Sequence, residues 1–275
     1  MVLISMKHLS QNRKDRKKML NIQEYVRPQS LEEAYELVQN RKNIIVGGML
    51  WLKMMNRSVE KAIDLCDLHL DTIEEDDEQF TIGAMVTLRQ LETHAGLNAY
   101  THDAMKHSVE HIIGVQFRNC ATVGGSIFGR YGFSDVLSMF MGLDAYVELY
   151  NGGIVPMREF AWMRPSLDIL VRVIVKKTPI KVCYKSQRNV STDFPVLTCC
   201  ASYMNDTYSV VIGGRPLKAI AYEKQMELND ESIEAFIEEV SSEIKLGSNN
   251  LGSAEYRQKL VKVLMRRSLK ELEAQ

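Results

Sequence analysis

The sequence contains no apolar run near the roughly 20 residues that a membrane-spanning helix needs, and its N-terminus lacks the apolar core of a signal peptide. An excess of one charge is also missing, because 34 lysines and arginines face 35 aspartates and glutamates, a formal net charge of -1. Such a balance gives no electrostatic reason to expect nucleic acid or a membrane as a partner. We therefore expect a cytoplasmic protein.

Clustered metal ligands are absent as well. An iron–sulfur centre needs several thiolates at one point, usually from C-x-x-C pairs, and the chain has no such pair. Its cysteines are an odd number of scattered residues, Cys66, Cys120, Cys183, Cys199 and Cys200. His107 and His111 are four residues apart, but no H-E-x-x-H pattern includes them. We expect no metal ion or cluster on this chain.

No G-x-G-x-x-G follows a strand, which argues against a Rossmann unit. Two diglycine segments are present instead. Val46-Gly47-Gly48 follows a short apolar strand, and Thr122–Ser126 (TVGGS) precedes an apolar helical segment. Glycine lets the backbone approach a ligand, and successive free N–H groups beside a hydroxyl can surround a pyrophosphate. One diglycine is usually an ordinary turn, but two together predict loops that hold one diphosphate.

The patterns along the chain predict an α+β protein. Ser30 and Glu33 have the spacing of a capping box at the start of a surface helix. Apolar periodicity predicts further helices at 88–99, 102–113, 135–143, 231–244 and 253–272. Strands are expected at 43–46, 61–65, 80–84, 169–175, 196–204 and 208–212, and a hairpin over 145–155 that turns at Asn151-Gly152.

These elements divide the chain into four parts. Residues 1–18 are rich in lysine and arginine without apolar periodicity, which favours a flexible basic extension over an arm for nucleic acid or lipid. Residues 19–80 and 81–165 form two α/β and α+β subdomains. Residues 166–275 form a small C-terminal domain of a sheet and helices.

The order of five motifs resembles the FAD-binding subunit of the molybdenum hydroxylases, the family of xanthine dehydrogenase and carbon monoxide dehydrogenase. The resemblance covers residues 20–165 well and extends with weaker motifs to Leu272. Its motifs are Val46-Gly47-Gly48, Ile82–Thr87, Gln116–Asn119, Thr122–Ser126 and Ser134-Asp135. It implies a two-subdomain FAD-binding fold of the vanillyl-alcohol-oxidase type, followed by a small α+β domain.

The resemblance also implies the cofactor contacts, and no catalytic side chain, because the flavin itself carries the redox step. The first diphosphate loop would be Ile45, Val46, Gly47, Gly48, Met49 and Leu50, and the second Thr122, Gly124, Gly125 and Ser126. Asp135 would contact the sugar-like chain of FAD, although a helix N-terminus also attracts a carboxylate for its own stability. Lys185 would lie near the flavin ring, with an exposed strand-edge lysine as the alternative.

Some positions depart from the family pattern. Many relatives have polar residues after the first diglycine, where this chain has Met49 and Leu50. Side-chain hydrogen bonds to a diphosphate are lost there, which leaves backbone donors. Ile112 and Ile113 stand where relatives place an aromatic residue against the flavin, so apolar packing persists without stacking.

The function that the resemblance implies is electron transfer. A xanthine dehydrogenase-like oxidoreductase subunit of this kind would carry FAD and act within a multi-subunit complex. A molybdenum-cofactor subunit would supply electrons to the clusters of an iron–sulfur subunit. This chain would take the electrons from those clusters and pass them to NAD or another acceptor. The assembly would be a dimer of heterotrimers. The alternatives are a stand-alone flavin oxidoreductase and a cofactor-free structural or assembly subunit.

Overall fold

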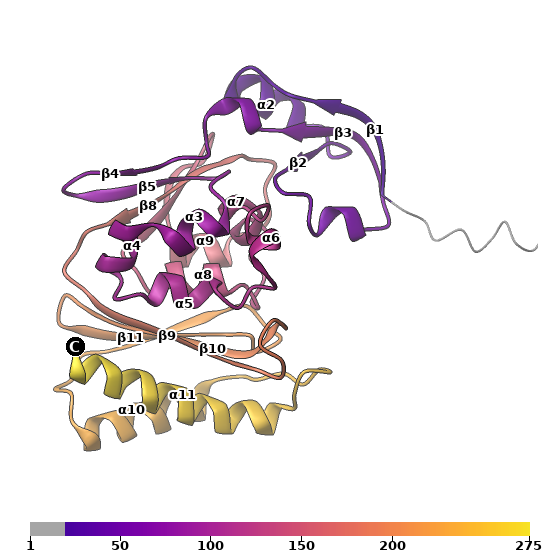
Figure 1. Ribbon diagram of the computed structural model, residues 1–275. Helices are drawn as coiled ribbons and strands as arrows, with labels where there is room; N and C mark the ends of the chain where they lie inside the picture. Colours follow the sequence, from indigo (N-terminus) through magenta and orange to yellow (C-terminus); the bar gives the residue numbers. More distant parts are fainter. Residues whose placement is uncertain (1–19) are drawn as a thin grey trace, which may run out of the picture.

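The computed structural model describes residues 20–275, which build three sheets (Figure 1). We call the parts around them the first lobe (residues 20–68), the second lobe (69–177) and the third lobe (181–275). The first lobe stands at the top of the view, and the third lies below the second. The expected basic extension over 1–18 falls outside the described residues. Within them, no helix combines the length and apolar character that crossing a bilayer requires.

The first lobe is a small parallel sheet with one helix. Its strands pair in the order β1-β3-β2 and are β1 (Asn21–Val26), β3 (Ser58–Asp64) and β2 (Ile44–Val46). The helix is α2 (Leu31–Val38), and two short 3₁₀ turns follow at η1 (Leu52–Met54) and η2 (Cys66–Leu68). Ser30 caps α2 by accepting from the N–H of Glu33, as predicted, whereas the Glu33 carboxylate accepts from Gln29 rather than from the cap.

The second lobe contains an antiparallel sheet of five strands and seven short helices. The strands pair in the order β4 (Ile73–Glu75), β5 (Gln79–Gly83), β8 (Leu170–Lys176), β6 (Ala145–Leu149) and β7 (Gly153–Pro156). The helices are α3 (Leu88–Thr93), α4 (Ala95–Tyr100), α5 (Ala104–Val109), α6 (Val115–Arg118), α7 (Val123–Ile127), α8 (Asp135–Met141) and α9 (Met157–Trp162).

This five-stranded sheet extends across both predicted domain boundaries, after residue 80 and after residue 165. The strand β4 belongs to it although it begins before residue 80, and β8 belongs to it although it follows residue 165. The reason is hydrogen bonding across the chain, since β8 pairs with β5 on one side and with β6 on the other. A strand that comes late in the sequence therefore completes the second lobe.

The third lobe is an antiparallel sheet with helices on one face. The strands pair in the order β12 (Ile220–Lys224), β11 (Thr207–Gly213), β10 (Pro195–Met204) and β9 (Lys181–Arg188). The long helices α10 (Asp230–Glu243) and α11 (Ala254–Ala274) cover the outer face, and α5 and α8 lie against the inner face (Figure 1). The third sheet is thus a layer between two sets of helices.

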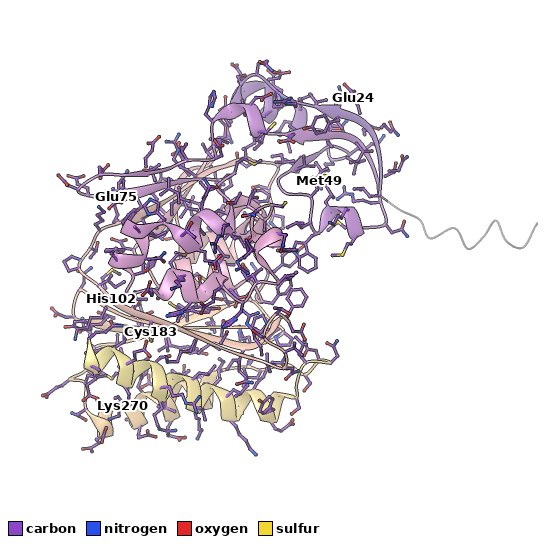
Figure 2. The ribbon with its side chains drawn as sticks, in the orientation of Figure 1. Glu24, Met49, Glu75, His102, Cys183 and Lys270 are labelled. Atoms are coloured by element: carbon purple, nitrogen blue, oxygen red, sulfur yellow. The ribbon has the colours of Figure 1, made fainter. Side chains whose placement is uncertain are left out.

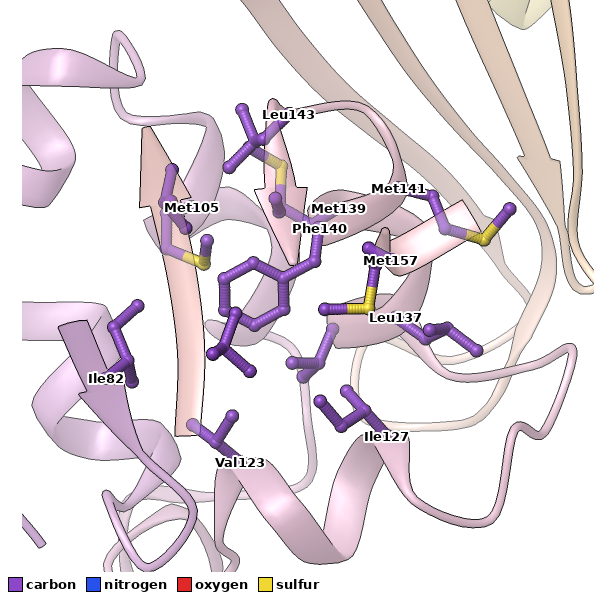
Figure 3. Close-up of a cluster of buried hydrophobic side chains, with 14 of the residues drawn as sticks. Ile82, Met105, Val123, Ile127, Leu137, Met139, Phe140, Met141, Leu143 and Met157 are labelled. Atoms are coloured by element: carbon purple, nitrogen blue, oxygen red, sulfur yellow. The ribbon is translucent and has the colours of Figure 1, made fainter. Parts of the chain in front are cut away.

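The largest core lies between the second and third sheets. All seven residues of α8 are buried, and Phe140 lies at the centre of the cluster of apolar side chains in Figure 3. Full burial of an apolar side chain stabilises the fold by roughly 1.5–3 kcal/mol. Because α8 is buried on every side, its first residue, Asp135, is carried into the interior of the protein.

Two predicted helices are shorter in the structure. The helix expected over 88–99 breaks at His94, whose Nδ1 accepts from the N–H of Leu97 and so caps α4 as a separate helix. The helix expected over 102–113 is reduced to α5, because His102, Asp103 and Ile113 adopt left-handed backbone angles. Apolar spacing alone does not reveal these interruptions.

A buried ion pair ties α6 to α3. Arg118 Nε lies 2.7 Å from Glu92 Oε2, Arg118 Nη2 lies 3.0 Å from Oε1, and both side chains are almost completely buried. Burial by itself raises the pKa of Glu92, but the hydrogen bonds and charges of Arg118 and Arg89 outweigh it and hold the pKa below its ordinary value. Arg118, part of one of the recognised motifs, therefore has a structural partner.

We predict that Glu92→Gln lowers the free energy of unfolding by about 3–5 kcal/mol, because Arg118 is left buried without a counter-charge. Denaturant unfolding at pH 7 measures the change. Glu60→Gln is the matched control, because Glu60 pairs with Lys42 at the surface, and it should change stability little. Equal losses in the two variants would contradict the prediction.

The same pair predicts a pH dependence. The pKa of Glu92 is lower in the folded protein than its ordinary value of 4.5. The contribution of the ion pair is therefore complete above that value and is lost as the pH falls through the folded-state pKa. On acidification, the wild type should lose more stability than Glu92→Gln does, which denaturant unfolding from pH 7 to pH 3 can test.

Candidate functional site

The first diglycine loop presents a row of unpaired backbone donors. The chain leaves β2 at Val46, passes through Gly47-Gly48, and reverses at Met49, which has a left-handed φ of 59° and is labelled in Figure 2. Among residues 20–275, no acceptor bonds the N–H groups of the next stretch, Gly48, Met49, Leu50 and Trp51. Successive free N–H groups form a concave binding place for an anion.

The two diglycine segments lie in direct contact. A Cβ built on Gly48 would lie 1.7 Å from the carbonyl oxygen of Cys120, and one built on Gly47 would lie 2.5 Å from Thr122 Oγ1. Neither position has room for a side chain. The glycines therefore allow the first lobe to approach the second, and they bring the Thr122 hydroxyl beside the free N–H groups.

The backbone of the second diglycine segment is already bonded, which corrects the expectation of free N–H groups there. Val123 and Gly124 donate to the carbonyls of Val86 and Ala84, both at 2.8 Å. Gly125 donates to Thr122 Oγ1 at 3.1 Å, and Ser126 donates to the Thr122 carbonyl at 3.0 Å. Thr122 Oγ1 can still donate its own proton, because no acceptor in the described chain takes it.

Asp135 lies in a buried network at the start of α8. The Tyr184 hydroxyl donates to Asp135 Oδ1 at 2.7 Å, and Arg188 Nη2 lies 2.5 Å from the same oxygen. In the described part of the chain, no other residue donates a hydrogen bond to Oδ2. One carboxylate oxygen therefore has two side-chain donors from β9, and the second has none from another described residue.

The network shifts the pKa values of its members. Burial raises the pKa of Asp135, while Arg188 and the Tyr184 hydroxyl act in the opposite direction. Burial raises the pKa of Tyr184 well above 10, and the neighbouring carboxylate adds to the rise, so the phenol stays protonated and donates. Neither Tyr184 nor Arg188 was identified from the sequence, because they lie 49 and 53 residues beyond Asp135.

The structure separates Lys185 from the other predicted contacts. Successive side chains of a strand point to opposite faces. On β9, Tyr184 points to Asp135, whereas Lys185 Nζ lies 2.5 Å from Glu271 of α11, on the other face of the third sheet. Lys185 therefore points away from Asp135, and its position on the edge strand β9, in an ion pair and 28% exposed, agrees better with the alternative of an exposed strand-edge lysine than with a contact to the flavin.

Four aromatic side chains cluster beside the glycine loops. They come from the loop after β2, the α7–α8 connection and the β9–β10 loop, and they are Trp51, Tyr131, Phe133 and Phe194. The Trp51 and Phe194 rings stack at 5.3 Å between centroids, and Phe194 meets the edge of Phe133 at 4.9 Å. All four are more than a third exposed.

The aromatic cluster provides a stacking surface, whereas the sequence predicted apolar packing without stacking at Ile112 and Ile113. Ile113 is about half exposed with a left-handed backbone, and Ile112 packs on the central core, so neither supplies an aromatic surface. The sequence signal for the cluster was weak but present. Trp51 follows the first diglycine by three residues, and Phe133 directly precedes Ser134-Asp135.

These residues fit the diphosphate of a dinucleotide. The available donors are backbone N–H groups and one hydroxyl. Binding of a diphosphate by these donors requires neither a lysine nor a polar side chain after the diglycine. Met49 packs against the small core of the first lobe and Leu50 against the central core, which explains why both are apolar. Within residues 20–275, no three His, Cys, Asp or Glu side chains gather as metal ligands.

We predict that Asp135→Asn lowers the free energy of unfolding by about 3–5 kcal/mol, since it leaves Arg188 buried without a counter-charge. Lys185→Met is the control, because Lys185 follows Tyr184 on the same strand, β9. Loss of its partly exposed ion pair with Glu271 should lower the free energy of unfolding by at most about 1 kcal/mol. Denaturant unfolding compares the two variants. A larger loss for Lys185→Met would contradict the assignment of the ion pairs.

Comparisons with known proteins agree with this geometry. Residues 18–177 match the family described as FAD binding domain in molybdopterin dehydrogenase, and residues 183–272 match the CO dehydrogenase flavoprotein C-terminal domain. The uncharacterized protein YgfM of Escherichia coli is 28% identical over 207 residues, covering 72% of this chain and 77% of its own length.

Two further relatives align over nearly the whole chain. The glyceraldehyde dehydrogenase medium chain of Sulfolobus acidocaldarius is 24% identical over 274 residues, with 90% of this chain and 97% of its own length covered. A chain of the carbon monoxide dehydrogenase of Hydrogenophaga pseudoflava has the same fold, with a TM-score of 0.82, 18% identity, and coverage of 91% and 97%. Because the family match spans more than half of the sequence, the chain belongs to the FAD-binding subunits of the molybdenum hydroxylases.

Proposed function

We propose that this chain is the electron-transfer subunit of a molybdenum hydroxylase, holding an FAD that takes electrons singly from a partner's iron–sulfur clusters and releases them in pairs to an acceptor such as NAD. The observation that carries the proposal is the row of four N–H groups from Gly48 to Trp51 that no acceptor in residues 20–275 takes, on a loop whose glycines contact the second glycine segment at Cys120 and Thr122. The family match supplies the identity of the ligand.

The residues of this chain would divide the binding between them. The N–H groups of the first loop and the Thr122 hydroxyl would bind the diphosphate. Gly124 and Gly125 would keep the second segment close, since a Cβ on Gly124 would meet the Ala84 carbonyl at 2.9 Å. Asp135 Oδ2 would accept from hydroxyls of the sugar-like chain, while Arg188 and Tyr184 fix the carboxylate.

The rest of the assembly is inferred from the family. The proposed partners are an iron–sulfur subunit and a molybdenum-cofactor subunit, arranged as a dimer of heterotrimers. The relatives are named for carbon monoxide and glyceraldehyde dehydrogenases, so a xanthine dehydrogenase-like specificity is one choice among several. The substrate would bind on another polypeptide. NAD as acceptor and a cytoplasmic location stay predictions.

One observation favours a second candidate, a structural subunit that has lost its cofactor. Met49 and Leu50 direct their side chains into apolar clusters and offer no hydrogen bond to a phosphate. The N–H groups of the same two residues argue against this candidate, because no acceptor within residues 20–275 takes them and they stay available to a phosphate. A stand-alone flavin oxidoreductase has no comparable support.

We predict that the purified chain binds FAD. The visible absorption spectrum before and after adding FAD, with the released cofactor identified, should show a bound flavin that dithionite bleaches. Co-purification of iron–sulfur and molybdenum subunits would support its place in a complex. A folded chain that takes up no FAD when supplied would contradict the electron-transfer function and favour the structural subunit.

We predict that Gly48→Ala lowers the affinity for FAD roughly tenfold or more, which corresponds to about 1.4 kcal/mol, and lowers stability by about 1–3 kcal/mol through overpacking. The new Cβ would lie 1.7 Å from the Cys120 carbonyl and push the loops apart. Gly114→Ala is the control, because its Cβ would meet only Gln116 Oε1 at 3.7 Å. Titration of FAD into each folded variant measures the affinities, and equal values would refute the role of the close contact.

A further inference from the structure

The stack of Trp51 on Phe194 joins two parts of the chain that lie far apart in the sequence. Trp51 belongs to the first lobe, directly after the diglycine loop, and Phe194 belongs to the β9–β10 loop of the third lobe. Their ring planes lie 27° apart at a centroid distance of 5.3 Å. The contact therefore joins the first and third lobes beside the segment that carries the free N–H groups.

The two residues differ in how firmly they are held. Arg188, which is paired with Asp135, donates from Nη1 to the Asp193 carbonyl at 2.5 Å, and the Phe194 N–H donates to Asp193 Oδ1 at 2.7 Å. The backbone N–H of Trp51 has no such partner in the described chain, and the nearby Met54 is 65% exposed. The Trp51 carbonyl accepts from the Met54 N–H at 3.1 Å, so the part that can move is the indole side chain of Trp51, which is 44% exposed, and Phe194 is the wall on which it stacks.

The position of Trp51 matters because its own N–H belongs to the proposed diphosphate site. The isoalloxazine of FAD is a planar aromatic system, and aromatic rings favour stacked or edge contacts with one another. A ring inserted between two others needs about 3.5 Å on each side, or roughly 7 Å in all. The observed 5.3 Å leaves no space for it.

We propose that Trp51 is a gate residue of the flavin site. Its indole occupies the place on Phe194 that the isoalloxazine takes when FAD binds, and it must leave that place first. The inference rests on the proposed function, because it requires FAD at this site. The side chain of Trp51 thus acts against the flavin half of the cofactor, whereas its backbone N–H belongs to the diphosphate site.

The test compares Trp51→Leu with the wild-type full chain, both freed of flavin. Trp162→Leu is the matched control, because Trp162 is the other tryptophan, is also about half exposed, and contacts Lys218 instead of the aromatic cluster. Two ligands are titrated: FAD, and ADP, which has the diphosphate without the flavin. Stopped-flow flavin fluorescence gives the association rate of FAD, and calorimetry gives both affinities.

We expect Trp51→Leu to bind FAD roughly two- to twelvefold more tightly and with faster association, the factor that an aromatic pair of about 0.5–1.5 kcal/mol represents. ADP affinity should change much less than FAD affinity, because the substitution keeps the backbone N–H of residue 51, and Trp162→Leu should match the wild type. Trp51→Phe, which keeps a smaller stack, should fall between the two and guards against a misfolded leucine variant.

Three results would overturn the gate. FAD binding that is unchanged or weaker in Trp51→Leu would make Trp51 a bystander or a direct wall of the flavin site. An equal gain for FAD and ADP would mean that the substitution acts on the loop and not on the ring. If the wild type binds no FAD at all, the proposed function itself fails, which is a distinct outcome from the first two.

Discussion

The contact between the two glycine segments is the constraint on which the site depends. Gly48 lies so close to the Cys120 carbonyl that no side chain fits between them, and Gly47 has Thr122 Oγ1 as its neighbour. This approach sets the first lobe against the second without any side chain between them. Within residues 20–275, the N–H groups of the first loop have no hydrogen-bond acceptor and stay available for a ligand.

The ion pair of Asp135 and Arg188 joins the third lobe to the second, as the contact of the glycine segments joins the first lobe to the second. Because α8 is buried on all sides, a carboxylate at its start needs a charged partner from another element. Arg188 supplies it from the end of β9 and, through the Asp193 carbonyl, also fixes the loop that carries Phe194. One buried charge thereby positions both a candidate ligand oxygen and an aromatic wall.

Local rules predict part of this arrangement from the sequence. The strand before Gly47, the cap at Ser30 and the two C-terminal helices follow from spacing over a few residues, and the structure has them all. The diglycine segments are recognisable for the same reason. What they touch is not, because the acceptors for Val123 and Gly124 lie on the segment that follows β5.

Long-range geometry decides the remainder. Lys185 and Tyr184 are neighbours in sequence, yet the alternation of a strand sends one to Glu271 and the other to Asp135. A shared motif predicts which residue type stands at a position, but it does not predict which face of the sheet the side chain occupies. The strand β8 shows the same limit, since only its pairing with β5 and β6 reveals that it completes the second lobe.

The apolar residues after the first diglycine follow from this division of labour. Where backbone N–H groups supply the donors, the side chains of the same residues are free to pack, and Met49 and Leu50 do so in two different cores. Each side chain then anchors the loop that carries the donor, which limits the entropy that a bound diphosphate must remove. A polar side chain at either position adds a hydrogen bond and gives up that anchor. The departure from the family pattern therefore exchanges one way of holding the ligand for another and does not by itself indicate a lost site.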